Sequence, residues 1–171
     1  MNYIKLILIA LAFSNLQAQT DALLVSKKLI ADWSEYPVYP QLIAENAASI
    51  EWKEEYRYLD SIEVYGITYL SDGLKIKGLM AKPKKAGSYP CIIYNRGGNR
   101  EFGSLKAAHG ALSLGRLANE GYVVIASQYR GNGGSEGREE FGYSNRFLRV
   151  EQKLLRVVFV FCHVVLLDCA S

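Results

Sequence analysis

Two short segments separated by an Asp-Gly turn constrain the fold of this chain more than any other feature. The first, Ile62–Leu70, is rich in β-branched and aromatic residues, and the second, Leu74–Ala81, alternates apolar residues with lysines over its first half. Asp72 and Gly73 between them are residue types that accept the positive φ of a tight hairpin turn. The pattern predicts an antiparallel β-hairpin over Ile62–Ala81.

A strand–helix–strand pattern follows the hairpin. Tyr89–Tyr94 and Tyr122–Ala126 are short apolar runs, which are typical of strands buried on both faces of a parallel sheet. Between them, Leu105–Glu120 has apolar residues at helical spacing, and Gly121 suits the end of a helix. Parallel strands joined in this way imply a right-handed crossover. The predicted fold class is α/β, with an antiparallel hairpin leading into a βαβ unit of a mixed, mostly parallel sheet.

Three motifs, in this order along the chain, resemble those of a known family. Tyr69–Leu79 resembles the hairpin that opens the catalytic domain of prolyl-oligopeptidase-type α/β-hydrolases, and Pro90–Gly98 resembles the family's next strand and oxyanion-side loop. Tyr129–Gly137 resembles the Tyr-Arg-Gly-rich loop after the following strand. The resemblance implies a partial α/β-hydrolase domain over residues 61–142 and the acyl-enzyme chemistry of a serine hydrolase.

The resemblance assigns the oxyanion-side loop to Arg96, Gly97, Gly98 and Asn99. In α/β-hydrolases this loop supplies one of the N–H groups that stabilise the negative oxygen of the tetrahedral intermediate. Glycines let the backbone approach the substrate closely. Arg96 stands where many members have histidine or tyrosine, so we expect the donor to be a backbone group. The alternative is a tight turn with no chemistry, because glycines after a strand are common in α/β proteins.

A second, glycine-rich loop contains a literal Gly-x-Ser-x-Gly sequence centred on Ser135. The residues that we single out in this loop are Arg130, Gly131, Gly133 and Gly134. A nucleophilic serine of this fold sits directly at a strand-to-helix turn. Here the predicted strand ends near Gln128, and residues 138–142 are a poor start for a helix. We therefore disfavour Ser135 as the nucleophile and assign no catalytic residue.

The remaining candidates also lack the expected arrangement. Ser113 falls inside the predicted helix, and His109 precedes Ser135, whereas the order in this fold is serine, then acid, then histidine. His163 follows Ser135, but no acid lies at the expected strand end between them, and Asp168 comes after His163. Both histidines are predicted to be packed or surface residues. The nucleophile elbow and the triad are predicted to be missing from this chain.

The N-terminal region is typical of export. Lys5 is followed by an apolar run, Leu6–Phe13, which is shorter than the roughly 20 residues of a membrane-spanning helix. This arrangement predicts a signal peptide over residues 1–18 and a periplasmic or extracellular location. Residues 19–60 are predicted to be a helical lead-in, with one helix in Asp21–Glu35 and another in Gln41–Ile50.

Residues 143–171 form an atypical apolar tail in which the family pattern stops. Leu154–Leu167 is apolar but too short for an ordinary membrane span, so no stable span is expected. The abrupt change of pattern favours a change of reading frame near Gly142. A second interpretation makes Leu148 onward a helix that covers the sheet.

Cysteine content and charge limit the other function classes. The three cysteines, Cys91, Cys162 and Cys169, cannot all pair within one chain, and their spacing does not suit zinc. Cys91 lies in a predicted strand and is expected to be an inert buried thiol. The net charge of +3 comes without any run of basic residues, so no nucleic-acid partner is expected. No metal or organic cofactor is implied.

These observations support three hypotheses about function. The first is a truncated, exported serine hydrolase whose complete parent cleaves peptide bonds and which is inactive as this chain. The second keeps the fold but makes the parent a carboxylester or acyl hydrolase, so that the substrate is an ester. The third is a non-catalytic exported remnant or binding domain.

Overall fold

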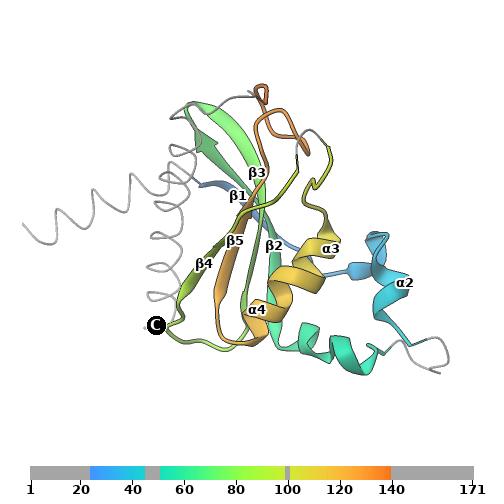
Figure 1. The fold of residues 1–171 in the computed structure, drawn as a ribbon. Helices are drawn as coiled ribbons and strands as arrows, with labels where there is room; N and C mark the ends of the chain where they lie inside the picture. Colours follow the sequence, from blue (N-terminus) through green and yellow to red (C-terminus); the bar gives the residue numbers. More distant parts are fainter. Residues whose placement is uncertain (1–23, 45–50, 99–100, 140–171) are drawn as a thin grey trace, which may run out of the picture.

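The computed structural model describes residues 24–44, 51–98 and 101–139, and it shows an α/β fold (Figure 1). Its sheet has five strands in the order β1-β2-β3-β5-β4. The strands, in chain order, are β1 Leu24–Leu29, β2 Ile62–Ser71, β3 Leu74–Pro83, β4 Cys91–Tyr94 and β5 Val123–Ser127. The predicted fold class, α/β with a mixed sheet, is confirmed.

The sheet of the described residues is mostly antiparallel, which corrects the expectation of a mostly parallel one. The pairs β1–β2, β2–β3 and β3–β5 are antiparallel, and β4–β5 is parallel. The reason is that the described residues contain one βαβ unit, whereas the hairpin and the strand before it add three antiparallel pairings. The parallel β4–β5 pair predicted from the sequence is confirmed.

The hairpin forms as predicted. β2 and β3 pair without interruption from Ile62↔Pro83 to Ser71↔Leu74. Asp72 and Gly73 have φ values of 54° and 77°, the left-handed region that a tight hairpin turn requires. The turn residues therefore fix the register of the two longest strands.

β1 corrects the predicted helix in Asp21–Glu35. Leu24–Leu29 pairs antiparallel with β2, from Leu24↔Tyr69 to Leu29↔Tyr65. Most of the strand is exposed, because it lies at the edge of the sheet. The hydrogen bonds offered by the edge of β2 override a weak helical pattern.

The second predicted helix of the lead-in is also shorter than expected. α2 spans Tyr39–Leu42, and Ile43 then forms an antiparallel bridge with Trp52. Residues 45–50 lie outside the described residues. Two 3-10 helices, Trp33–Glu35 and Glu54–Asp60, complete the lead-in.

The helix predicted over Leu105–Glu120 is confirmed as a continuous helical segment. It consists of α3 Ala107–His109, a π-helical turn Gly110–Leu114 and α4 Gly115–Asn119. Gly121 follows with a φ of 91°, as expected for a glycine that ends a helix. This segment connects the parallel strands β4 and β5.

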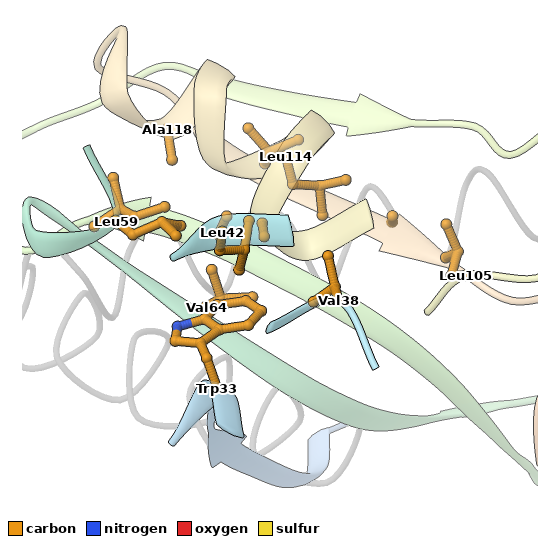
Figure 2. Packing of buried hydrophobic residues seen from close by; sticks show 13 residues of the cluster. Trp33, Val38, Leu42, Leu59, Val64, Leu105, Leu114 and Ala118 are labelled. Atoms are coloured by element: carbon orange, nitrogen blue, oxygen red, sulfur yellow. The ribbon is translucent and has the colours of Figure 1, made fainter. Parts of the chain in front are cut away.

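One core joins the lead-in, the helical segment and one face of the sheet (Figure 2). Leu42 of α2 lies between Val64 of β2 and the helical segment with Leu114 and Ala118, and Trp33 packs in the same cluster. Leu42, Leu114 and Ala118 are completely buried. The lead-in therefore helps to fix the helical segment on the sheet.

The opposite face of the sheet has its own apolar cluster, and Cys91, which contacts it, differs from the prediction. Tyr69, Met80 and Ile125 are fully buried there, and Cys91 of β4 packs against the cluster. Cys91 is disulfide-bonded, so the prediction of an inert thiol is wrong. A disulfide leaves no signal in the local sequence, and both other cysteines lie outside the described residues.

Two further expectations concern the sheet edge and the chain ends. All residues of β4 are half-buried rather than fully buried, because β4 is the last strand of the described sheet. The predicted signal peptide, residues 1–18, and the tail, residues 143–171, lie outside the described residues. In the part of the chain that the structure describes, no helix is long and apolar enough to cross a membrane.

A charged cluster on β2 and β3 adds a pH-sensitive contact. The Glu63 carboxylate accepts hydrogen bonds from Lys82 Nζ at 2.6 Å and from Tyr65 Oη at 2.8 Å. Burial raises the pKa of Glu63, but the hydrogen bonds and the charge of Lys82 outweigh it and hold the pKa below its ordinary value. The cluster therefore stabilises the fold while Glu63 is ionised.

Candidate oxyanion-side site

Two loops meet where the parallel strands β4 and β5 end. We call residues 95–98 and 101–106 the β4 loop, and residues 128–139 the β5 loop. The carboxyl ends of parallel strands lie at the same edge of a sheet. The Gly133 N–H of the β5 loop donates to Glu101 Oε1 of the β4 loop at 3.3 Å. The loops that the sequence singles out are thus brought into contact.

Gly97 and Gly98 present their backbone at the surface of the β4 loop. Both are exposed. Gly98 has a φ of 83°, and a Cβ there would lie 2.3 Å from Phe102 O, so the turn requires glycine. At Gly97, by contrast, no described atom other than those of Gly97 and its two chain neighbours lies within 4 Å of where a Cβ would stand. Asn99, the fourth residue of the predicted loop, lies outside the described residues.

The Arg96 side chain points into the protein instead of into this open space. Its guanidinium donates from Nη1 to Gln128 Oε1 at 2.9 Å and from Nη2 to Phe102 O at 3.0 Å. It also lies 4.4 Å from the centre of the Tyr129 ring, and Tyr129 Oη donates to Arg96 O at 2.7 Å. With only 4% of Arg96 exposed, its side chain shapes the loop from beneath, and the backbone of the two glycines forms the accessible surface.

Gln128 is the residue of this site that the sequence did not reveal. It follows β5 directly, and 4% of it is exposed. Its amide contacts Arg96, Ser104 and Leu105 of the β4 loop. The sequence shows only that a polar residue directly follows a buried strand, and this does not indicate which residues its side chain contacts.

Arg130 turns away from the β4 loop. Its guanidinium forms an ion pair with Asp72 and donates to Ser71 Oγ at 3.3 Å. The Arg130 side chain therefore stabilises the hairpin turn. The neighbouring glycines of the predicted loop, Gly131, Gly133 and Gly134, all have positive φ, and they let the β5 loop fold back onto β3.

Ser135 ties the β5 loop to the edge of β3. Its Oγ accepts a hydrogen bond from Lys77 N at 3.0 Å, and 8% of the residue is exposed. The next residue repeats this pattern, since Glu136 N donates to Lys75 O and Glu136 Oε2 accepts from Lys75 N. The loop thus continues the hydrogen bonding of a strand beyond the end of β5. This is not the strand-to-helix turn of a nucleophile elbow.

The other candidate residues from the sequence lie in the helical segment or outside the described residues. Nδ1 of His109 accepts a hydrogen bond from Lys106 N at 3.0 Å at the start of the helical segment. Ser113 lies inside the π-helical turn. His163 and Asp168 lie outside the described residues. Among the described residues, no group of three histidine, cysteine or acidic side chains is placed to hold a metal ion.

A buried tyrosine lies beside the site on the opposite face of the sheet. Tyr69 Oη shares a hydrogen bond of 2.7 Å with Ser127 Oγ, one residue before Gln128. Burial raises the pKa of Tyr69, against the opposing effects of the Ser127 hydrogen bond and the charge of Arg130. The phenol therefore stays neutral and acts as part of the core.

Comparison with known proteins finds similarity both in sequence and in structure. No family model matches the chain. The uncharacterized peptidase YtmA of Bacillus subtilis (strain 168) is 40% identical over 85 residues, which cover 50% of this chain and 32% of YtmA. The chain thus spans about a third of the length of the relative that it matches. Acetyl xylan esterase 1 from Thermoanaerobacterium sp. JW/SL YS485 aligns over 86% of this chain and 47% of its own, at 20% identity and a TM-score of 0.37.

Proposed function

We propose that this chain provides the oxyanion-side part of an exported serine hydrolase of the prolyl-oligopeptidase-type α/β-hydrolases. The observation that most favours this function is the exposed backbone at Gly97 and Gly98, held at the carboxyl end of β4 by a buried Arg96. The 40% identity to a protein named as a peptidase supports the same function.

The chemistry required of these glycines is the stabilisation of a developing charge. When a serine attacks a carbonyl, the oxygen becomes negative, and a backbone N–H aimed at it lowers the barrier by about 2.7–4 kcal/mol. An N–H of Gly97 or Gly98 is proposed as that donor, opposite the one that follows the nucleophile. Peptide bonds are the proposed substrate.

The attacking serine is not assigned to the described residues. Ser135 Oγ is engaged with Lys77 N, and His109 Nδ1 is engaged with Lys106 N. We therefore propose that the nucleophile, acid and base come from sequence equivalent to the rest of the relative, and that this chain alone is inactive.

Export is part of the proposal. Disulfides form and persist in oxidising compartments, and Cys91 is disulfide-bonded. This supports the interpretation of residues 1–18 as a signal peptide. The proposed location is periplasmic or extracellular.

A chimera tests the hydrolase function. Residues 24–139 of this chain, which include the core shared by lead-in and sheet, would replace the corresponding stretch of YtmA. We expect this chimera, like YtmA itself, to be labelled by a fluorophosphonate on a serine of the YtmA part. A folded chimera that stays unlabelled while YtmA is labelled would contradict the proposal. If the full exchange fails to fold, exchange of residues 95–106 alone asks the same question.

Turnover by the chimera then decides the substrate class. Cleavage of peptide reporters supports the peptidase assignment, whereas hydrolysis of aryl esters without peptide cleavage would replace it by an ester or acyl hydrolase. The unaltered chain is expected to show neither activity and no labelling. A fluorophosphonate adduct on Ser135 of the unaltered chain would contradict the inactive assignment.

A further inference from the structure

One buried amide holds both ends of the β4 loop. The Gln128 side chain forms four hydrogen bonds: Oε1 accepts from Arg96 Nη1 (2.9 Å) and Leu105 N (3.1 Å), and Nε2 donates to Leu105 O (2.8 Å) and Ser104 Oγ (3.2 Å). Arg96 directly precedes the two exposed glycines, while Ser104 and Leu105 close the loop. A single side chain therefore fixes the positions on both sides of Gly97 and Gly98.

Gln128 is itself anchored to the centre of the sheet. Its backbone N–H donates to Lys77 O of β3 at 2.9 Å, and the residue follows β5, whose residues are all buried. The next residue extends the contact, because Tyr129 Oη donates to Arg96 O at 2.7 Å. The side chains of Gln128 and Tyr129 thus connect the β4 loop to the sheet.

Space for the amide is provided by a glycine of the β5 loop. A Cβ on Gly133 would lie 2.3 Å from Gln128 Nε2 and 2.7 Å from its amide carbon, closer than any real contact. The Gly133 N–H also donates to Glu101 of the β4 loop. Glycine is therefore required at position 133 because any larger residue would clash with the Gln128 side chain.

From these contacts we propose that Gln128 is a positioning residue that holds the Gly97–Gly98 backbone in the orientation needed to stabilise an oxyanion, with Gly133 leaving room for it. This inference rests on the proposed function. An amide suits the role because the site requires an acceptor for Arg96 and Leu105 N together with a donor for Leu105 O, while the Ser104 hydroxyl can accept or donate. Glutamate would keep the acceptor contacts and lose the donor contact to Leu105 O, and alanine would lose all of them.

The first test measures amide hydrogen exchange at Ser104 and Leu105 of the β4 loop in the full chain, because their N–H groups are hydrogen-bonded to Glu101 O and to Gln128 Oε1. We expect Gln128→Ala to accelerate exchange there by about tenfold or more, since local opening of the loop becomes easier. Gly133→Ala should act in the same direction through displacement of the amide. Tyr69→Phe is the matched control, because it removes a buried hydrogen bond to Ser127 without touching the β4 loop, and it should leave these two amides unchanged.

The second test uses the chimera and separates binding from chemistry. In Gln128→Ala we expect the first-order rate constant of phosphonylation to fall by about tenfold or more, with little change in the affinity for the fluorophosphonate, because the lost interaction is made in the transition state. Gln128→Glu should recover part of that rate through its retained contact with Arg96. Tyr69→Phe should not alter the rate constant.

The outcomes distinguish the two proposals. An unlabelled but folded chimera contradicts the proposed function. A labelled chimera in which Gln128→Ala reacts as fast as the parent contradicts the positioning role and leaves the proposed function in place. Unchanged exchange at Ser104 and Leu105 in both Gln128→Ala and Gly133→Ala also overturns the positioning role, independently of any activity.

Discussion

Replacing Ser135 by alanine distinguishes a structural serine from a nucleophile. Ser135 Oγ accepts a hydrogen bond from the partly buried Lys77 N–H at 3.0 Å. Without it, that donor loses its partner at the edge of β3, at a cost of about 1–2 kcal/mol. For a domain of this size, such a loss lowers Tm by roughly 3–8 °C.

The matched control is Glu136→Gln. The Glu136 side chain makes the equivalent contact to Lys75 N at 2.8 Å, and glutamine keeps an acceptor oxygen there. Because Glu136 is exposed, we expect a change within about 0.5 kcal/mol. Urea unfolding followed by circular dichroism, together with thermal unfolding, measures both variants against the parent chain.

A catalytic serine would behave in the opposite way. Removing a nucleophile from a strained elbow commonly leaves stability unchanged or improves it, and it abolishes labelling. We expect Ser135→Ala to be less stable and the labelling of the chimera to be unaffected. An alanine variant that is as stable as the parent and that eliminates labelling would refute this reasoning.

Three further predictions concern the loop, the disulfide and pH. Gly98→Ala should destabilise the chain, since its Cβ would lie 2.3 Å from a carbonyl oxygen at a φ of 83°, whereas Gly97→Ala should unfold at the parental urea concentration; equal midpoints would contradict the loop geometry. Peptide mapping without reductant should find Cys91 in a disulfide, and an intrachain partner must be one of the two other cysteines, Cys162 or Cys169; alkylation of Cys91 without reduction would show otherwise. Because the folded-state pKa of Glu63 is lowered, its contribution is complete above the ordinary value of 4.5 and is lost as the pH falls through the lowered pKa. Urea unfolding at a series of pH values should therefore show a shallower acid loss for Glu63→Gln, and identical pH dependence in the two proteins would exclude this contribution.

Local sequence signals predicted the elements whose causes are local. The Asp72–Gly73 turn fixes the hairpin because its positive φ values depend on those two residues alone. Gly121 ends the helical segment for the same kind of reason. The order of strand, helix and strand then determined the parallel β4–β5 pair.

Features that depend on distant partners were missed. β1 forms because β2 offers it an edge, and nothing within Leu24–Leu29 reveals that edge. The disulfide of Cys91 likewise depends on a partner that nothing in the local sequence around Cys91 indicates.

The same distinction between local and distant causes applies to the residues of the candidate site. Gly97 and Gly98 could be predicted from their place after an apolar run, because that place is a property of the local sequence. The role of Gln128 depends on contacts with residues 23 and 32 positions earlier, so no local pattern distinguishes it. Arg130 was grouped with the site, yet its partner is Asp72 in the hairpin turn.

The proposed function depends on the backbone of Gly97 and Gly98 stabilising an oxyanion. A crystal structure of the chimera with a phosphonate bound covalently to its serine tests this most directly, because the phosphonyl oxygen takes the place of the negative oxygen. We expect that oxygen at about 2.7–3.1 Å from the N of Gly97 or Gly98. A phosphonyl oxygen bound by other donors, with both glycine N–H groups directed elsewhere, would contradict it.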